Sequence, residues 1–362
     1  MKAWRNANTV FIGSKIRIAC DMATLTHSEW NQETGGLEVA KAFAAQIRGK
    51  NVLITGVSPE SIGSSIALSI ASQGPALLIL ASRTKSKLEQ VHQSLRDAYP
   101  EVTIKIVILD LMSQDSVRKA AAEVSQLTDR LDLIINNAGL MTQTRQTTKE
   151  GIEGQFGANH LGHFLLTNAL LPQLLKSAAE SSTPGATRVI NLTSLGHRLS
   201  PVRFSDYNLE KSNDEVPEEE RHAPFHPMFS GVASDNGYNG FVAYGQAKSA
   251  NILFSVGINS KLGSKGISSY AVHPGSIWTG LSRDLDPEAT AAIEKTSKFW
   301  KNLDQGAATV LVAALDPALN DSKGILLHDC QISDAMPYAT DPKLAEKLWS
   351  LSEKLVGTNF KL

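Results

Sequence analysis

Apolar residues fall into short runs along the chain, and amphipathic stretches lie between the runs. The runs are rich in Val, Ile and Leu, which is typical of parallel strands that are covered on both faces. The predicted strands are residues 50–55, 76–81, 102–109, 131–135, 187–192 and 266–272, with a short last strand at 325–327. The pattern therefore predicts a sheet that is buried between other layers.

The stretches between these runs carry apolar residues at helical spacing. The predicted helices are residues 37–48, 64–72, 85–98, 116–127, 151–176 and 342–355, a helix around Tyr244, and a helix from Asp304. Strands that alternate with helices are typical of a doubly wound α/β fold, so we predict a single Rossmann domain with a parallel sheet and helices on both faces. In that architecture ligands bind beyond the carboxyl ends of the strands.

Two segments interrupt the alternation. Residues 205–241 are polar and rich in turn residues, and residues 280–302 form a second insertion. A loop of this length inside a compact domain is usually a functional lid or disordered. We expect residues 1–36 to be a partly disordered extension, and residues 37–362 to be the domain that carries both insertions.

The net charge and the cysteine content limit which partners, metals and compartments the sequence is compatible with. A formal net charge of −1 at pH 7 gives no electrostatic reason to expect nucleic acid or an anionic membrane as a partner. Cys20 and Cys330 lie far apart and match no metal-ligand spacing, so we expect a reducing compartment and no metal. No apolar run reaches about 18 residues, which predicts a soluble, cytoplasmic protein without a membrane span. Residues 1–20 are basic and lack acids, which leaves a mitochondrial presequence open.

Tyr244 and Lys248 are the first candidates for chemistry. Residues four apart share one helix face, and a nearby cation favours the ionised phenol, lowering its pKa from about 10. A chance pair on a helix surface is the alternative. Gly56 and Gly63 lie in the turn between the first strand and a helix, where backbone N–H groups can hold a phosphate. Glycines that serve backbone geometry alone are again the alternative.

Further motifs follow in one order, and with them the chain resembles the short-chain dehydrogenase/reductase family over about residues 37–357. The resemblance is carried by Thr55-Gly56…Gly63, Asp110, the NNAG motif at 136–139, Asn159 in GANHLGHF, Ser194 in RVINLTS, Tyr244-x-x-x-Lys248, and Pro274-Gly275 with Thr279. NHLGHFLLTN, YGQAKSANILF and the HPG turn are similar to the retinol-dehydrogenase and WW-domain-oxidoreductase branch. EWNQETGGLEVAKAF and PYATDPKLAEKLWSLSEKL are similar to its fungal-type members.

The resemblance implies a catalytic role for four residues. Tyr244 would exchange a proton with the substrate oxygen, and Lys248 would lower its pKa and bind the nicotinamide ribose. Ser194 would donate a hydrogen bond to the carbonyl oxygen. Asn159 would hold a water that links Lys248 to solvent. The structural alternatives are a surface Tyr/Lys pair, a serine in a strand-end turn and an asparagine satisfied inside a helix.

The resemblance also implies a dinucleotide site. Its expected residues are Gly56, Ser58, Ile62 and Gly63 at the pyrophosphate and ribose, Asp110 and Leu111 at the adenine, Asn137, Ala138 and Gly139 on the adenosine side, Tyr244 and Lys248, and Pro274, Gly275, Ile277 and Thr279 at the carboxamide. An NAD site usually offers an acid after the second strand, whereas this chain has Arg83 there. A guanidinium matches a 2′-phosphate, so we expect NADP(H). A solvated loop arginine is the alternative.

One departure from the family pattern stands in the first turn. Gly56 to Gly63 is one residue longer than usual, and Ser61 replaces the middle glycine, where its hydroxyl could be a donor. His160 and His163 are expected only to pack or hydrogen-bond near the site. By analogy, candidates for an apolar substrate pocket are Leu195, Phe229, Trp278, Leu281, Phe299 and Trp300.

The first hypothesis is therefore an NADP(H)-dependent oxidoreductase that interconverts a carbonyl and a hydroxyl on an apolar small molecule, in a secondary-metabolite pathway. The alternative is a nucleotide-binding regulatory or scaffold protein without turnover, suggested by Ser61 and the 205–241 loop. Transient use of NADP(H) for epimerisation or dehydration is a third. Relatives often pair through the helices that carry Asn159 and Tyr244, and monomers also occur, so both a monomer and a homodimer are expected possibilities.

Overall fold

A twisted, mostly parallel sheet organises the chain. The computed structural model describes residues 25–224, 237–320 and 324–361, and within them one eight-stranded sheet has the order β3-β2-β1-β4-β5-β6-β7-β8. The strands are β1 Asn51–Thr55, β2 Leu77–Ser82, β3 Ile104–Ile108, β4 Leu133–Asn136, β5 Thr187–Leu192, β6 Ile267–His273, β7 Leu326–His328 and β8 Gln331–Ser333. The strands β1 to β7 run parallel. The predicted fold class is confirmed.

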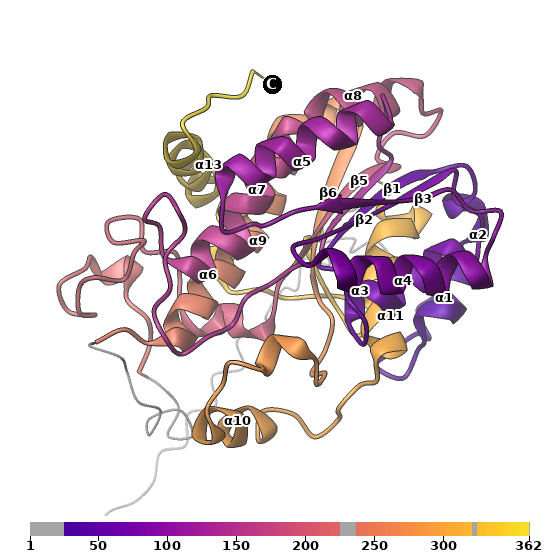
Figure 1. Cartoon of the computed structure of the whole chain (residues 1–362). Helices are drawn as coiled ribbons and strands as arrows, with labels where there is room; N and C mark the ends of the chain where they lie inside the picture. Colours follow the sequence, from indigo (N-terminus) through magenta and orange to yellow (C-terminus); the bar gives the residue numbers. More distant parts are fainter. Residues whose placement is uncertain (1–24, 225–236, 321–323, 362) are drawn as a thin grey trace, which may run out of the picture.

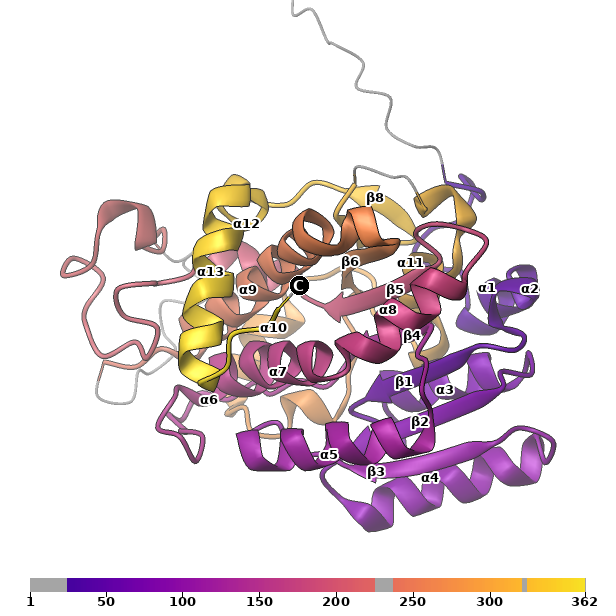
Figure 2. The ribbon, with the colours of Figure 1, turned by 90° about the horizontal axis from the view of Figure 1, so that it is seen from above.

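Helices cover both faces of this sheet (Figures 1 and 2). One layer holds α1 Gly36–Ala42, α2 Ala44–Ile47, α3 Ile62–Ala71, α4 Lys85–Ala98 and α11 Leu303–Leu315. The other holds α5 Gln114–Leu127, α7 Gly162–Ala169, α8 Leu171–Glu180, α9 Gly240–Leu262 and α13 Pro342–Val356. Shorter helices are α6 Gly154–Phe156, α10 Pro287–Glu294 and α12 Pro337–Thr340.

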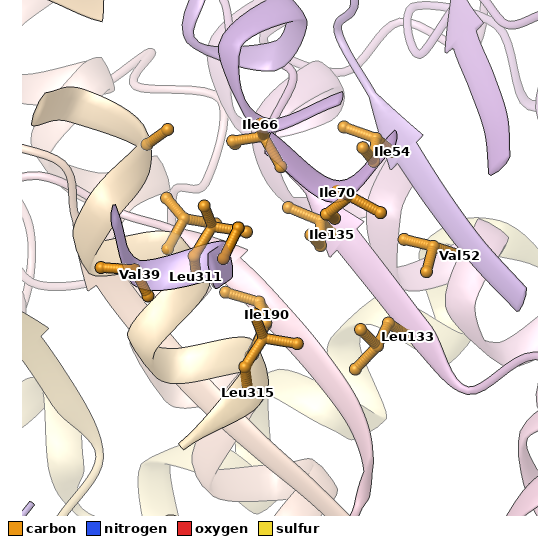
Figure 3. Packing of buried hydrophobic residues seen from close by; sticks show 14 of the residues in the cluster. Val39, Val52, Ile54, Ile66, Ile70, Leu133, Ile135, Ile190, Leu311 and Leu315 are labelled. Atoms are coloured by element: carbon orange, nitrogen blue, oxygen red, sulfur yellow. The ribbon is translucent and has the colours of Figure 1, made fainter. Parts of the chain in front are cut away.

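Alternate residues of each central strand enter opposite layers. Val52 and Ile54 of β1 pack with α3 and α11, as Figure 3 shows, while Leu53 faces the α5 and α7 side. All three side chains are buried. Burying one such side chain contributes roughly 1.5–3 kcal/mol, so both faces of the strand stabilise the fold. This explains why the strands appear in the sequence as nearly unbroken apolar runs.

An aromatic cluster fixes the C-terminal helix on α9. The ring centroids of Phe164 on α7 and Trp349 on α13 are 5.1 Å apart, and Phe254 on α9 lies 5.9 Å from Trp349. Gly257 permits this approach, because a Cβ there would lie 3.1 Å from the indole. The face of α7 and α9 that points away from the sheet is therefore covered by the chain's own C-terminal helix.

The predicted strands and the predicted helix 85–98 are confirmed, but the single helix predicted at 151–176 is wrong. The segment is divided into α6, a π-helical turn at Gly157–Leu161, α7 and α8. The break at Leu170 precedes Pro172, which lacks an N–H donor and restricts the residue before it. The helix predicted at 37–48 is likewise divided, at Phe43.

The strand predicted to be the last, at 325–327, is not the last. β8 follows β7 and pairs with it antiparallel through a two-residue turn. Asp329 and Cys330 in this turn have φ values of 48° and 62°. Such turns usually read Asn-Gly or Asp-Gly, and with Cys330 in place of the glycine the hairpin is not recognisable from residue types.

The two insertions differ in their attachment. In the first, the buried carboxylate of Glu220 accepts hydrogen bonds from the backbone and hydroxyl of Ser205, at 2.8 and 2.6 Å. Arg145, outside the insertion, donates to the carbonyls of Asn208 and Leu209, both at 2.6 Å, and so ties the described residues 205–224 to the body of the domain. In the second, α10 lies at the edge of the molecule in Figure 1 and packs through Ala289 on Phe241 at the start of α9.

The predicted extension at residues 1–36 is described only from Leu25 onward, and the proposed presequence lies outside the described residues. Trp30 is buried and stacks on His27, with ring centroids 4.0 Å apart, and its edge meets Phe43. Within the part of the chain that the structure describes, no helix is long and apolar enough to cross a membrane.

Candidate active site

A cavity of about 310 Å³ lies where the carboxyl ends of the strands meet the loops that follow them. It spans the point between β1 and β4 where the strand order reverses, as expected for a ligand site in this architecture. The predicted cofactor residues that line it are Gly56, Ser58, Ile62, Gly63, Arg83, Asp110, Leu111, Asn137, Ala138, Gly139, Tyr244, Lys248, Pro274 and Thr279.

Two predicted cofactor residues do not belong to the cavity wall. The side chain of Ile277 packs against α11, because a Cβ on Gly306 would overlap it. Gly275 has φ +104° and backs onto the stem of Lys301, whose Cδ would lie 2.6 Å from a Cβ at this glycine. Sequence reasoning assigned the whole turn to the site, whereas the structure directs part of it inward.

The turn after β1 brings backbone close to the ligand space. Gly56 has φ +74°, and a Cβ there would lie 2.6 Å from Cα of Ala138. A Cβ on Gly63 would lie 2.6 Å from the carbonyl oxygen of Gly56. The N-terminus of α3 follows at once, and its unpaired N–H groups favour an anion. A side chain at either position would fill this space, so only glycine leaves it open; we call the turn between Gly56 and Gly63 the glycine cradle.

The additional residue in this turn is accommodated by Glu60, which has a positive φ of 52°. Ser61 caps α3: its hydroxyl accepts from the backbone of Ser64 at 3.1 Å and donates to the carbonyl of Ser58 at 2.7 Å. Here its proton is used within the turn, and Ser61 also lines the cavity, so its donation to a ligand stays a prediction.

One end of the cavity is basic. Arg83, which follows β2, and Lys87, in the first turn of α4, both line the wall. Sequence reasoning found Arg83 and missed Lys87, although residues four apart at a helix start lie on one side. The other lining residues that it missed are Ala81, Ser82, Thr84, Leu109, Met112, Leu140, Gln146, Ala158, Leu192, Thr193, Gly280 and Arg283.

The loop after β4 is held by side-chain amides. Asn137 donates through Nδ2 to the carbonyl of Thr55 at 2.7 Å. The buried amide of Asn159 accepts from the N–H of Leu140 at 2.6 Å and donates to its carbonyl at 2.9 Å. Asn159 thus fixes the residue after Gly139, and its predicted contact with a water stays a prediction.

Helix α9 presents Tyr244 and Lys248 to the other end of the cavity. Asn239 caps the helix by accepting from the backbone of Phe241 at 2.9 Å. Both functional side chains are buried, at 8% and 3% exposure, and the Lys248 ammonium lies 5.3 Å from the Tyr244 ring centroid. Lys248 also donates to the carbonyl of Leu192 at 3.1 Å, which anchors its Nζ beside the end of β5.

Ser194 and Asn159 complete this end of the site, though neither lines the cavity itself. A Cβ on Gly196 would lie 3.1 Å from the Tyr244 ring and 3.4 Å from Ser194 Oγ, so the serine and the phenol are neighbours. A Cβ on Gly139 would lie 3.5 Å from Asn159 Oδ1 and 3.7 Å from Lys248 Nζ. The structure therefore brings the four predicted catalytic residues together.

The electrostatics correct one expectation. Burial raises the pKa of Tyr244 to about 12, and the hydrogen bond from Ser194 opposes this only in part. Burial lowers the pKa of Lys248 to about 8. A lowered pKa of Tyr244 was expected, whereas burial raises it in this structure; the effect of Lys248 on this pKa stays a prediction. Near neutral pH the phenol is protonated and can act as a proton donor.

The predicted apolar pocket is only partly present. Leu281 lines the cavity, whereas Leu195 and Phe299 do not, and Phe229 lies outside the described residues. Trp278 and Trp300 stack on each other, with ring centroids 4.6 Å apart and an interplanar angle of 2°. The two indoles close the base of the segment that contains α10.

The expectation for His160 and His163 is confirmed. His160 Nε2 is 2.8 Å from the hydroxyl of Ser352 on α13. His163 bonds to Thr55 and Asn159. Both imidazoles are buried and act as hydrogen-bonding partners beside the site.

Comparison with known proteins gives a consistent result. The sequence model of the short chain dehydrogenase family matches residues 50–211. The chain is 36% identical to "Short-chain dehydrogenase TIC 32 A, chloroplastic" of Brassica napus, over 89% of this chain and 94% of that protein. It is 33% identical to "Retinol dehydrogenase 13" of Homo sapiens, over 90% and 88% of the two chains.

Among solved structures, an uncharacterized protein from Mycobacterium paratuberculosis superimposes with a TM-score of 0.60 and 27% identity. That comparison covers 88% of this chain and 98% of the other. The TM-score over most of both chains indicates that the two proteins share a fold. The chain belongs to the short-chain dehydrogenase family, whose members are NAD(P)-dependent oxidoreductases of alcohol and carbonyl groups.

Proposed function

We propose that this chain is an NADP(H)-dependent oxidoreductase that interconverts a carbonyl and a hydroxyl group on an apolar small molecule. The observation that carries the proposal is the arrangement of one cavity. Tyr244 and Lys248 lie at one end, with Ser194 beside the phenol, and Arg83 and Lys87 lie at the other end. A protonated phenol and two basic side chains thus line one cavity, as a site for a nicotinamide cofactor with a 2′-phosphate would require.

The residues of the cavity fit such a cofactor. The glycine cradle at Gly56 and Gly63 and the N-terminus of α3 would hold the pyrophosphate. Arg83 and Lys87 would hold a 2′-phosphate, since neither residue 82 nor residue 84 is an acid that would bind a free 2′-hydroxyl. When bound, NADPH supplies the hydride.

The chain's own residues would supply the rest of the chemistry. Tyr244 would donate its phenolic proton to the substrate oxygen as negative charge develops there. Ser194 would donate a hydrogen bond to the same oxygen, in a site that excludes water. The Lys248 ammonium would compensate the phenolate that Tyr244 becomes. In the oxidative direction the same groups would act in reverse.

The test is NADPH consumption against a panel of apolar aldehydes and ketones. We expect Tyr244→Phe to reduce turnover by about 10²–10⁴-fold, the usual contribution of a general acid, and to bind NADPH as the parent does. Equal turnover by both proteins would overturn the assigned proton donor. Tight NADPH binding with no turnover of any substrate would favour the nucleotide-binding scaffold instead.

The choice of NADP over NAD has its own test. Arg83→Ala combined with Lys87→Ala should raise the KM for NADPH by roughly 10-fold or more, because charge-assisted hydrogen bonds are worth about 1.5–3 kcal/mol each. The KM for NADH should stay the same. Arg96→Ala, an exposed arginine on the same helix α4, is the control. An equal change for both cofactors would contradict a 2′-phosphate contact.

We also favour a monomer over a homodimer. This is supported by α13, because Trp349 and Ala345 cover the face of α9 around Gly257. That face belongs to the helices expected to pair in dimeric relatives. Sedimentation equilibrium should give the monomer mass, and a stable dimer would contradict this preference. A cytoplasmic location and a place in secondary metabolism stay predictions.

A further inference from the structure

His163 lies behind the cofactor side of the site without touching the cavity. It stands in the first turn of α7, is 2% exposed, and uses both ring nitrogens. Nδ1 is 3.0 Å from the carbonyl oxygen of Asn159, and Nε2 is 2.9 Å from Oγ1 of Thr55. These two bonds fix the orientation of the ring more tightly than packing alone would.

The directions of these bonds follow from the chemistry of the partners. A carbonyl only accepts, so Nδ1 of His163 must carry a proton and donate it to Asn159. The hydroxyl of Thr55 already accepts the N–H of Ala138, at 3.0 Å. The proton of that hydroxyl can be donated to Nε2 only when Nε2 is unprotonated, and this gives the hydroxyl proton an acceptor. A single state, the neutral imidazole with its proton on Nδ1, satisfies every bond.

This network joins three segments of the site. Thr55 is the last residue of β1 before Gly56, Ala138 belongs to the loop after β4, and Asn159 lies in the π-helical turn. Because a Cβ on Gly56 would already lie 2.6 Å from Ala138, these two segments have no room to slide. Loss of the bond network would release the loop that forms the floor of the cavity.

His163 follows directly after the π-helical turn, and this position favours a role near the site. At the π-helical turn the N–H of Gly162 donates to the carbonyl of Gly157, five residues back. Such turns displace carbonyls from their regular partners and are frequent at functional sites. The ring of His163 provides a donor to the Asn159 carbonyl, while the Asn159 amide holds Leu140.

We propose that His163 is a positioning residue, a neutral Nδ1–H imidazole that fixes the 136–139 loop against the phosphate turn and the π-helical turn. The proposal rests on the proposed function only for its kinetic consequences. The hydrogen-bond state itself is a property of the protein alone.

The surroundings keep this imidazole neutral. Burial is the main cause that lowers the pKa of His163 to about 4; the bond to Asn159 opposes the shift, and the charge of Lys248 adds to it. His160, the other titratable group nearby, has a pKa of about 3 for the same main reason. In a protonated ring, Nε2–H of His163 and the N–H of Ala138 would both point at the Thr55 hydroxyl, whose own proton would lose its acceptor.

The first test is NMR of histidine labelled with ¹⁵N, on the full chain without cofactor, with His163→Gln to assign the signal. We expect the Nδ1-protonated neutral tautomer from pH 6 to 8, whereas free imidazole prefers its proton on Nε2. An Nε2-protonated ring, or titration near the ordinary value of about 6.5, would overturn the proposal.

The second test is NADPH affinity by fluorescence titration. His163→Gln cannot span both partners, and we expect its Kd to rise by roughly 10-fold, the effect of losing one or two buried hydrogen bonds. His160→Gln is the matched control: the same substitution one helical turn earlier, bonded to α13 instead, should leave the NADPH Kd unchanged. An equal rise in both variants would indicate a general loss of structure and contradict a positioning role.

Thr55→Val removes the hydroxyl and keeps the side-chain shape, so it distinguishes a loss of the hydrogen bond from a loss of packing. If His163 acts through Thr55, the double variant Thr55→Val/His163→Gln should have the same NADPH Kd as whichever single variant has the higher Kd. Additive losses would overturn this coupling. If the parent protein bound no NADPH, the proposed function would fail, and the NMR result would still decide the state of His163.

Discussion

The two sides of the cavity are built by different means. On the cofactor side, short turns leave the strand ends and are bonded to one another: Asn137 donates to the Thr55 carbonyl, and Ala138 donates to its hydroxyl. On the substrate side, one long segment leaves β6 and returns to α11. Its ends are joined by the N–H of Lys301, which donates to the Ser276 carbonyl at 2.9 Å, and by the stacked indoles.

This difference indicates how the molecule divides its tasks. The cofactor side depends on backbone shape, which few residues other than glycine and asparagine can produce, and it recognises a ligand common to the whole family. The substrate side depends on side chains carried by a loop, and loops on a rigid scaffold tolerate change. Substitutions should therefore be severe on the first side and mild on the second.

The largest expected effect is at Gly56. Gly56→Ala places a Cβ 2.6 Å from Ala138 at a φ of +74°, whereas Gly49→Ala has nearly the same φ, +75°, with nothing within 4 Å. The left-handed conformation alone costs about 1–2 kcal/mol, and overpacking adds about 1–3 kcal/mol. Urea unfolding should show the larger loss for Gly56→Ala. Equal losses would mean that the Gly56–Ala138 contact relaxes freely.

A second expected effect is a gain of stability when the buried Lys248 is replaced. The pKa of Lys248 is about 8 in the folded chain, against about 10.4 unfolded. The unfolded chain thus binds more protons between these values, so stability rises with pH through this window, and the buried charge is destabilising below pH 8. The gap corresponds to about 3 kcal/mol.

Lys248→Met should therefore raise the free energy of unfolding at pH 7 by on the order of 1–3 kcal/mol and abolish turnover. The Leu192 carbonyl keeps a donor, since Asn251 Nδ2 lies 2.8 Å away. Lys265→Met, an exposed lysine just beyond α9, is the control and should change little. Unfolding measured from pH 7 to 10 checks this, and a less stable Lys248→Met at pH 7 would contradict it.

The smallest expected effect is on the substrate side. Trp278 is 43% exposed, and a stacked aromatic pair is worth about 0.5–1.5 kcal/mol, so Trp278→Ala should destabilise the protein by about this amount. The KM for an apolar carbonyl substrate should rise while the NADPH Kd stays the same. Leu37→Ala, at 42% exposure on α1, is the control. A changed NADPH Kd would show that the two sides are not independent.

Sequence reasoning succeeded where local pattern decides structure. Strands buried on both faces leave apolar runs, so each predicted strand was found, and the turns at their carboxyl ends contain most of the cavity wall. Lys87 and Arg283 were missed because a lone basic residue carries no motif. The break in 151–176 depends on Pro172 and on the packing of Gly157 against Thr148, and the latter contact forms only in the folded chain.

The remaining errors have the same physical origin. The pKa of Tyr244 depends on how much solvent the fold removes, which spacing along a helix does not reveal. Trp278 and Trp300, candidates by analogy for an apolar substrate pocket, stack on each other and do not line the described cavity, and their contact with a substrate stays a prediction. The hairpin of β7 and β8 was missed because Cys330 takes the turn position where Gly is usual, and cysteine rarely adopts a positive φ.

The stacked indoles have an optical consequence. Two parallel chromophores 4.6 Å apart couple electronically, so the pair should produce a split circular-dichroism signal and quench part of the tryptophan emission. Both effects depend steeply on separation and would vanish if the segment between residues 278 and 300 swung open. The protein therefore contains its own spectroscopic reporter of that segment, readable without a label during binding of cofactor or substrate.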